Sequence, residues 1–523
     1  MLLILLISAL FLFWTAIRKN NYWRNRGIPG PEPLPWKGNI DLIFGKNNPS
    51  ALQLFNWTKK YGRIYGIKNG WFNVLVISEP EMVKEMLVDK FESMYGHIVN
   101  PMIGNVNTSS MVHLFASKGR RWKRLRHIAN PAFSTFNLKR AMPIIDDTIQ
   151  KNIKLLKKTY IPGNYINILD YFTELTFDVI YRLAMGKQNS KEFCQLSRDT
   201  LTVFNNNIFD YLSYIFPWLG RNVLSPFLAA TGNLRRDPPI ILIEKIYKAV
   251  KQRKEEKMKK NEMEEENDEN NLNEKWVDFI DLFLESENEK VELKEYSGTF
   301  NRAEKVEKND RRNSLDEIVM NLFLFLLTGF DTTANTLSLI SHNLVIYPEV
   351  QKRLFEEIEE ICGLEEGEMP SYEQLSKLKY ADAVFYETQR LCPMAAAVVN
   401  RVCEETTTLG DITIEKGTVV STDLFTLHRD KKIWGEDSEE FKPERWLNNE
   451  GNIITPTAFY PFGGGPRICI GMRLGIMEIK MVLVHLLRSF ELKRCWKTEI
   501  ELNFSGQVVL NPETITVKLK SKQ

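Results

Sequence analysis

The chain has 523 residues, of which 43% are hydrophobic and 26% are charged, and this composition excludes collagen-like and wholly disordered proteins. Its 69 basic and 67 acidic side chains give a net charge of +2, so the charge balance gives no indication of a nucleic-acid-binding protein. The six cysteines are few and far apart, which excludes a disulfide scaffold.

The first 17 residues are almost entirely apolar, and four basic residues follow them: Arg18, Lys19, Arg24 and Arg26. A helix that spans a bilayer needs about 20 apolar residues. A cleaved signal peptide is the alternative, but no basic segment precedes the apolar run and no small-residue cleavage site directly follows it. We therefore expect residues 1–22 to form an uncleaved membrane anchor, with the bulk of the protein in the cytosol, on the side of the basic residues.

Residues 23–36 carry prolines at positions 29, 31, 33 and 35. Because proline fixes φ and removes a backbone donor, the stretch from Gly27 to Pro35 cannot form a helix or a central strand. We interpret it as a semi-rigid hinge between the membrane and the domain that follows. Over residues 37–523 apolar positions recur mostly at three- and four-residue spacing, which predicts one mostly helical domain with a minor β part.

Two polar stretches, residues 251–275 and 285–312, are expected to be exposed helix ends or loops, because they cannot bury enough apolar surface to order themselves. The apolar segment between them should dock on the core. Further along, four apolar residues at positions 412, 414, 419 and 420 surround Lys416 and Gly417. This pattern predicts a short hairpin within residues 408–420 that turns at these two residues.

The longest apolar helix is expected to begin at Ser314. Ser314 and Glu317 form a capping-box pattern at its start. Apolar residues then occupy nearly all of its faces as far as Tyr347, which predicts burial at the centre of the domain. Asp331 and Thr332 interrupt this apolar surface. Polar residues buried within a helix need hydrogen-bond partners or a function, so this pair is a candidate for chemistry.

The sharpest feature is the segment from Phe462 to Gly471, with the sequence FGGGPRICIG. Its run of three consecutive glycines and its proline permit a tight turn that most residues could not adopt. A helical pattern follows at once, so Cys469 should lie just before the N-terminus of a helix. The unpaired amides and the positive end of the helix dipole at that position are expected to stabilise a thiolate and to lower the pKa of Cys469.

This segment resembles the haem-binding signature of the cytochrome P450 family, with matching residues at Phe462, Gly465, Arg467, Cys469 and Gly471. The resemblance extends from the proline-rich hinge to the C-terminus. Within the family, the sequence is most like the microsomal clan that includes the vertebrate drug-metabolising family three and related invertebrate enzymes. It implies the mainly α fold with small β-sheets of that family, and haem b with Cys469 as its axial iron ligand. Arg467 would contact a haem propionate, and Phe462 would pack near the sulfur.

The same resemblance implies a structural network of Glu387, Arg390 and Arg445 that holds the cysteine loop in place. Glu387 and Arg390 lie three residues apart in a helical pattern, and Arg445 belongs to the later segment FKPERW. The six histidines form no ligand-like pair. We expect them to be structural or exposed, and His428 is assigned no catalytic part.

Two basic regions are expected to hold the cofactor. Trp122 and Arg126 are four residues apart and share a helix face; by resemblance they reach a haem propionate, and Arg401 is a third propionate contact. The other basic residues of the segment 118–127 are expected to face outward. They would form either a solvated helix face or a docking patch for an acidic electron-donor protein.

By resemblance, Asp331 and Thr332 form an acid–alcohol pair above the iron. Thr332 would order water at bound oxygen, and Asp331 would pass protons inward as a general acid. Thr328 departs from the family, which usually has alanine or glycine there, and its larger side chain would narrow the space above the haem. Substrate contacts are expected from a small set of residues, which either line a cavity or pack in the core: Leu327, Thr328, Ala396 and Val398.

The implied activity is that of a haem-thiolate monooxygenase, which inserts one atom of dioxygen into lipophilic substrates such as xenobiotics, steroids or fatty acids. The sequence has no fused Rossmann or flavin domain, so the electrons of NADPH must come through a partner. NADPH–cytochrome P450 reductase is the expected donor, with cytochrome b5 as a second candidate, and the endoplasmic reticulum membrane is the expected location. A haem-thiolate isomerase or dehydratase is one alternative, against which Asp331 and Thr332 argue, and a haem-binding sensor without turnover is another.

Overall fold

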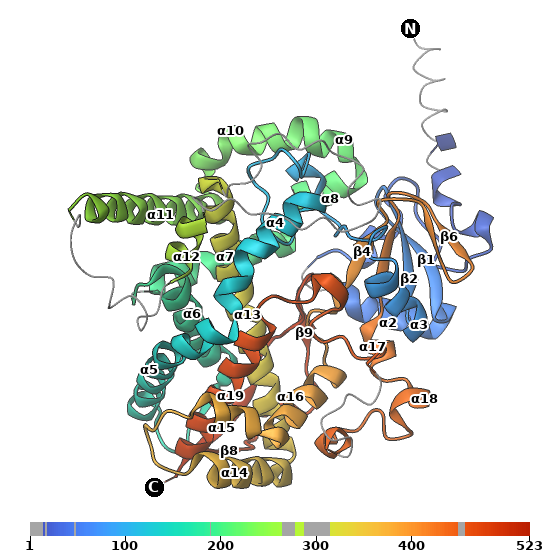
Figure 1. The fold of residues 1–523 in the computed structure, drawn as a ribbon. Coiled ribbons are helices and arrows are strands. Elements are labelled where there is room, and N and C mark those ends of the chain that lie inside the picture. The colour runs from blue at the N-terminus through green and yellow to red at the C-terminus, as the bar shows by residue number, and fades with distance from the viewer. Residues whose placement is uncertain are drawn as a thin grey trace.

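The structure is a computed structural model, and it describes residues 14–15, 18–45, 49–188, 190–263, 278–286, 314–447 and 456–522. Helices make up most of it, and a four-stranded sheet lies with α2 and α3 on one side of the helical part (Figure 1). This is the mainly α architecture with a minor β part that the sequence predicts.

The helices in chain order are α2 (Ser50–Tyr61), α3 (Pro80–Lys84), α4 (Gly119–Ala129), α5 (Thr135–Thr159), α6 (Ile168–Met185), α7 (Lys191–Asn206), α8 (Ile208–Ile215), α9 (Pro217–Leu219), α10 (Ser225–Arg235), α11 (Pro238–Met263), α12 (Phe279–Ser286), α13 (Leu315–Ile346), α14 (Pro348–Cys362), α15 (Tyr372–Lys377), α16 (Lys379–Leu391), α17 (Leu424–Leu427), α18 (Lys431–Trp434) and α19 (Met472–Ser489). The strands are β1 (Ile64–Asn69), β2 (Phe72–Ile77), β3 (Tyr165–Asn167), β4 (Asn400–Val402), β5 (Thr407–Leu409), β6 (Ile412–Ile414), β7 (Val419–Thr422), β8 (Phe490–Lys493), β9 (Phe504–Ser505), β10 (Asn511–Pro512) and β11 (Thr516–Ser521).

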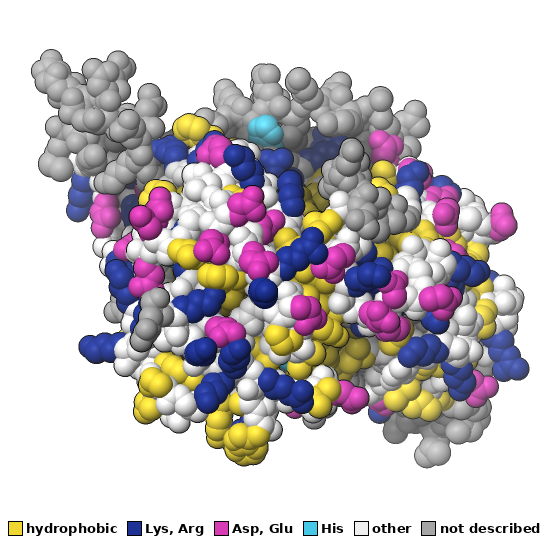
Figure 2. All heavy atoms as spheres, turned by 90° about the horizontal axis from the view of Figure 1, so that it is seen from below, with side chains coloured by type: hydrophobic (Ala, Val, Ile, Leu, Met, Phe, Trp, Pro, Cys, Tyr) yellow, Lys and Arg dark blue, Asp and Glu magenta, His cyan; other side chains and the backbone are white. Residues whose placement is uncertain are grey.

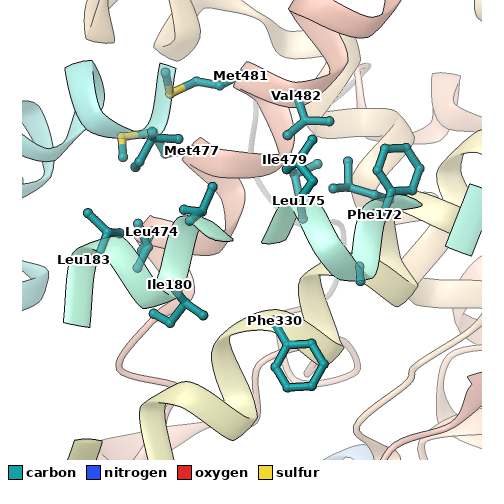
Figure 3. Close-up of a cluster of buried hydrophobic side chains, with 14 of the residues drawn as sticks. Phe172, Leu175, Ile180, Leu183, Phe330, Leu474, Met477, Ile479, Met481 and Val482 are labelled. Atoms are coloured by element: carbon teal, nitrogen blue, oxygen red, sulfur yellow. The ribbon is translucent and has the colours of Figure 1, made fainter. Parts of the chain in front are cut away.

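Helix α13 runs through the centre of the helical part (Figure 1). Its start is the predicted capping box: the Glu317 amide donates to the Ser314 hydroxyl, and the Ser314 amide donates to the Glu317 carboxylate, both at 3.2 Å. It packs closely on α6, because a Cβ added at Gly329 would lie 2.7 Å from Cγ1 of Ile180. Figure 3 shows Phe330 of α13 and Ile180 of α6 in a hydrophobic cluster that α19 completes with residues such as Leu474.

The four-stranded sheet has the order β1-β2-β7-β4. Strand β2 pairs with β7 in parallel, so the sheet joins the N-terminal part of the chain to a strand near its C-terminal end. The predicted hairpin is present as β5 and β6, but its turn lies at Gly410 and Asp411. The prediction that the hairpin turns at Lys416 and Gly417 is wrong. These two residues come just before β7, which pairs with β2 and β4 in the larger sheet and whose four residues are all buried.

The proline-rich hinge packs against β1. Trp23 is buried, and its indole N–H donates to the Ile67 carbonyl at 3.0 Å. The Gly66 amide donates to the Pro29 carbonyl at 2.8 Å, and a Cβ at Gly30 would lie 2.0 Å from the Gly66 oxygen. The segment therefore rests on the sheet and is not a free-standing spacer.

Most of the expected anchor, residues 1–13, 16 and 17, lies outside the described residues. Within the described part, one helix, α13, is long and apolar enough to cross a membrane, but its most apolar stretch is 72% buried inside the protein. We assign it to the core. On the face seen from below, basic and acidic side chains are interspersed, with hydrophobic side chains between them (Figure 2).

Candidate active site

The cysteine loop is shaped by a glycine and closed by a backbone hydrogen bond. Gly465 has a φ of 66°, which other residues rarely adopt, and a Cβ at this position would lie 1.9 Å from the Leu87 carbonyl oxygen. The Cys469 amide donates to the Phe462 carbonyl at 3.0 Å. Helix α19 then begins at Met472, so Cys469 lies just before a helix N-terminus, as predicted.

The thiol pKa differs from the prediction. Desolvation by the surrounding protein is the largest effect, and it raises the pKa of Cys469 above its ordinary value, although the residue is exposed. The backbone N–H groups of Gly471 and Met472 and the charge of Arg126 lower it by less. The helix terminus favours the thiolate, as predicted, but its effect on the pKa is smaller than that of desolvation. A bound metal cation would do so, since a coordinating thiol is deprotonated outright.

Three arginines from distant parts of the chain lie near the loop: Arg126 from α4, Arg401 from β4 and Arg467 from the loop itself. Arg126 donates to the Ile468 carbonyl at 2.9 Å. Arg401 is buried and donates to the Gly464 carbonyl at 3.2 Å. The chain thus gathers cations beside Cys469 and uses them to hold the loop.

Arg467 is buried against an aromatic ring and two backbone carbonyls. Its guanidinium lies 4.6 Å from the ring centre of Trp122 and donates to the carbonyl oxygens of Phe115 and Ser117. Burial lowers the pKa of Arg467 to about 9 and that of Arg401 to about 10. Repulsion from the neighbouring arginines adds to the effect on Arg467, so this group of side chains lacks negative charge.

Glu387 is fully buried and is the centre of the predicted network. Its carboxylate accepts hydrogen bonds from Nε and Nη2 of Arg390 and from Nε of Arg445, each at 2.8 Å. It also accepts from the Lys442 amide and from the indole N–H of Trp446, both at 2.9 Å. The structure therefore brings the three predicted residues together and adds a fourth side chain, Trp446, whose N–H no spacing rule could assign.

Arg390 and His428 extend this network toward the cysteine loop. Arg390 Nη1 donates to the His428 carbonyl at 2.8 Å, and Nε2 of His428 accepts from the Tyr460 amide at 3.2 Å. Burial lowers the pKa of His428 to about 3, with the charge of Arg390 adding to the effect, so the ring is neutral and able to accept. His428 therefore braces Tyr460, two residues before Phe462, through a contact that sequence reasoning missed.

Asp331 and Thr332 lie half-buried in the middle of α13, which continues unbroken through them. Thr332 Oγ1 donates to the Thr328 carbonyl at 2.9 Å, so the hydroxyl oxygen keeps its lone pairs for another donor. Desolvation raises the pKa of Asp331 to about 6, against the opposing effects of Asn335 and Arg198. A carboxyl group with this pKa can both accept and release a proton near neutral pH.

The expectation that the other cations of residues 118–127 face outward is wrong for Arg121 and Arg124. Arg124 is buried and donates to both carboxylate oxygens of Glu317, at 2.7 and 2.9 Å, and Arg121 donates to Glu317 at 2.9 Å. Burial alone would raise the pKa of Glu317, but these arginines hold it below its ordinary value. The ionised cap of α13 thus requires cations from α4.

The family model described as cytochrome P450 matches residues 28–519 of the chain. The chain belongs to the cytochrome P450 family. Among similar P450s of Caenorhabditis elegans, CYP13A7 is 38% identical over 510 residues, which cover 96% of this chain and 95% of the relative. CYP13A1 is 37% identical over 525 residues, 98% of each chain, and CYP-13B1 is 37% identical over 510 residues, 96% of each. As a P450, this protein is a haem-thiolate monooxygenase, and Cys469 is the axial ligand of its haem.

The residues around Cys469 fit the haem of a P450. The Nε atoms of Arg401 and Arg467 are buried and have no hydrogen-bond partner among the described residues. A buried, unpaired cation is costly. The two propionates of haem would supply the negative counter-charge that these arginines lack. Within the described ranges, no cluster of three or more His, Cys, Asp or Glu side chains is arranged to hold a metal ion by itself. This agrees with a haem site, in which the porphyrin would hold the iron and Cys469 would supply one further ligand.

His97 is a further residue of the P450 site that sequence reasoning did not single out. It is buried, stacks on Phe115 with ring centres 4.3 Å apart, and its Nδ1 has no partner within the described part of the chain. Burial, then the charges of Arg401 and Arg467, hold its pKa well below the ordinary value. It lies outside every motif, so only the fold could place it beside the arginines.

The predicted substrate residues differ in accessibility. Leu327 is buried in the main core and Ala396 in the second core around the sheet. Thr328 is exposed, with its hydroxyl donating to the Leu324 carbonyl at 2.8 Å, and Val398 is half-buried. Thr328 and Val398 are therefore the members of this set with accessible surface, and their role toward a P450 substrate stays a prediction.

Proposed function

We propose that this P450 is a membrane-anchored monooxygenase of the endoplasmic reticulum that oxidises small lipophilic compounds with electrons delivered by NADPH–cytochrome P450 reductase, or by cytochrome b5. The observation that carries the proposal is the pair Asp331 and Thr332 within the unbroken α13. A haem-thiolate isomerase or a sensor needs no supply of protons, whereas oxygen activation consumes them.

When bound, haem supplies an iron centre that binds and activates dioxygen. The chain's own residues perform the remaining tasks. Arg401 and Arg467, together with the N–H of Trp122, would hold the propionates, and the Glu387 network keeps Cys469 at a fixed position. With a pKa of about 6, Asp331 takes protons from water and releases them toward the Thr332 hydroxyl, whose oxygen can hold a water molecule in place.

Exposed apolar side chains on α8 to α10 support the membrane location. Ile208, Trp218, Phe227 and Leu234 are 57%, 72%, 50% and 85% exposed. An apolar helical surface of this kind can lie in the interface of a bilayer. It also suits an enzyme whose substrates dissolve in lipid.

Basic side chains on α4 support electron transfer from an acidic partner. Arg124 is buried, so the docking proposal concerns basic side chains with accessible surface, among them Arg120, Lys123 and His127, of which His127 is exposed and the other two are half-buried. Complementary charge would speed the encounter with a reductase more than it would raise its affinity.

The test uses the full chain with reductase in phospholipid vesicles. The reduced, carbon-monoxide-bound form should show the absorption band of thiolate-ligated haem, and Cys469→His should abolish it. With a lipophilic substrate, NADPH should be consumed and one atom of labelled dioxygen should enter the product. A product formed from a lipid peroxide without NADPH would support the isomerase instead, and binding without any turnover would support the sensor.

A further inference from the structure

A cavity lies away from the cysteine loop. It has a volume of about 210 Å³, is partly open to solvent, and is lined by the C-terminal half of α13, the end of α16, Arg429 and the segment that leads into β9. None of Asp331, Thr332 and Cys469 lines it. His342, which does, follows Thr332 by ten residues, or about 15 Å along the helix. The cavity is therefore separate from the oxygen-activating site.

One side of the cavity is rich in hydrogen-bond donors. Arg429 is fixed by hydrogen bonds from Nε to Glu439 and from Nη2 to the Leu391 carbonyl, while its Nη1 is buried without a partner among the described residues. His342 is buried, and its Nδ1 also lacks a partner in the described ranges. Asn343 donates one of its two amide hydrogens to Thr388 at 3.1 Å. The unpaired Nη1 of Arg429 can only donate, and a buried donor without an acceptor is costly, so this side favours a ligand with acceptor atoms.

The charge of the lining favours an anion. Arg429 is its only cation among the lining residues. Burial lowers the pKa of His342, so its ring is neutral at pH 7, and burial raises the pKa of Cys392 to about 11, so its thiol is neutral too. Glu439, the one carboxylate bonded to Arg429, is 65% exposed and solvated, which leaves the guanidinium only partly compensated.

The opposite side of the cavity is apolar. Five side chains form it: Leu339, Leu391, Ile500, Leu502 and Phe504. Ile500 is 70% exposed at the rim. The volume falls below the range of about 300–1,000 Å³ that drug-sized ligands occupy, so only a small molecule fits.

We infer that this cavity binds a small amphipathic carboxylate, whose anionic end meets Arg429 and whose hydrocarbon part lies against Leu502 and Phe504. The site is joined to the haem support by adjacent residues. Leu391 follows Arg390 of the Glu387 network, and Arg429 follows His428, which braces the segment before the cysteine loop. A ligand at Arg429 would tie the end of α16 to this turn, and it should slow the loss of haem on heating.

Octanoate is the probe, with octanamide as its uncharged counterpart. Its binding to the purified holoprotein is measured by equilibrium dialysis while an azole inhibitor saturates the haem pocket. One equivalent of octanoate should stay bound under this condition, and octanamide should bind at least tenfold more weakly. Displacement of all octanoate by the azole, or equal binding of octanamide, would overturn the inference.

Two variants and a matched control locate the site. Arg429→Gln should weaken octanoate binding about tenfold or more, and Leu502→Trp, which fills the cavity from the β9 side, should abolish it. Arg494→Gln, at an exposed arginine outside the lining, should bind as wild type. The thiolate-type band of the reduced, carbon-monoxide-bound form verifies that each variant folds with its haem. Folded Arg429→Gln and Leu502→Trp proteins that bind octanoate like wild type would contradict the assignment.

Discussion

Glu387 shows how one residue can determine the position of a reactive side chain many residues away. Its carboxylate accepts from Arg390, Lys442, Arg445 and Trp446, and Arg390 continues to the turn that contains His428. A buried carboxylate remains ionised only if its partners repay the loss of hydration. Each partner is therefore held in a fixed position, and together the partners determine where the cysteine loop lies.

The first prediction concerns this charge. Glu387→Gln leaves Arg390 buried without a counter-charge and leaves Arg445 only the weaker pair with Asp437 at 3.4 Å, so it should lower the free energy of unfolding by about 3–5 kcal/mol and reduce the haem content of the purified protein. Urea unfolding and haem absorbance measure the two effects. Glu436→Gln is the control, because its pair with Lys431 is exposed and should contribute little to stability. Equal stability of the two variants would contradict the role of Glu387.

The second prediction uses the pKa of about 6 for Asp331. An unfolded aspartate titrates near 3.9, so the folded state binds this proton more tightly. The stabilisation is complete below about pH 4 and is lost as the pH rises through about 6. Asp331→Asn should therefore match wild-type stability near pH 4 and exceed it by about 2 kcal/mol at pH 7, while its NADPH-dependent turnover falls. Chemical unfolding of both proteins between pH 4 and pH 7 measures this difference. If the difference in stability did not change with pH, the raised pKa of Asp331 would be disproved.

At the scale of elements, the contact between α6 and α13 depends on the absence of a side chain at Gly329. The added methyl of Gly329→Ala would meet Cγ1 of Ile180 at 2.7 Å. This overpacking should lower the free energy of unfolding by about 1–3 kcal/mol. Ile180→Val removes Cδ1, which would lie 2.9 Å from the added methyl, so the double variant should lose less than the sum of the two single losses. Strict additivity in chemical denaturation would show that the two residues do not interact.

Local patterns explain which elements could be predicted. The start of α13 and the turn before α19 depend on residues a few positions apart, and both lie where the sequence puts them. The pairing of Glu317 with Arg124 joins residues 193 positions apart, so no local pattern indicates it. Likewise, β7 is not part of the predicted hairpin because it pairs with β2, a strand more than 300 residues earlier in the chain. Tertiary pairing overrides a turn signal when it buries a whole strand.

At the scale of the molecule, the N-terminal segment combines two roles. Tyr22 donates to Glu415 at 3.0 Å and Trp23 donates to the Ile67 carbonyl, so the end of the proposed anchor is also part of the folded domain. Within the expected anchor, residues 1–22, the apolar run up to residue 17 is the part that would lie in the membrane. Membrane attachment and stability should therefore be separable by changes on either side of this boundary.

Deletion of residues 2–17 should leave the thermal midpoint unchanged within error and move much of the protein from the membrane fraction to the soluble fraction. Trp23→Ala should do the opposite: it keeps membrane attachment and lowers the free energy of unfolding by about 3–5 kcal/mol. Differential scanning calorimetry and sedimentation with vesicles measure the two properties. A truncated protein that sediments like the full chain would contradict the anchor.

The parallel pairing of β2 with β7 has a consequence for synthesis on the ribosome. Ile77 ends β2 and Val419 begins β7, so 342 further residues must be made before the pairing can start (419 minus 77). At about 5–20 residues per second, this takes roughly 20–70 s. For that time the β1–β2 hairpin shows an apolar edge that its own chain cannot yet cover, and such an edge invites pairing with other chains. We therefore expect the nascent enzyme to depend on a chaperone while it is being synthesised.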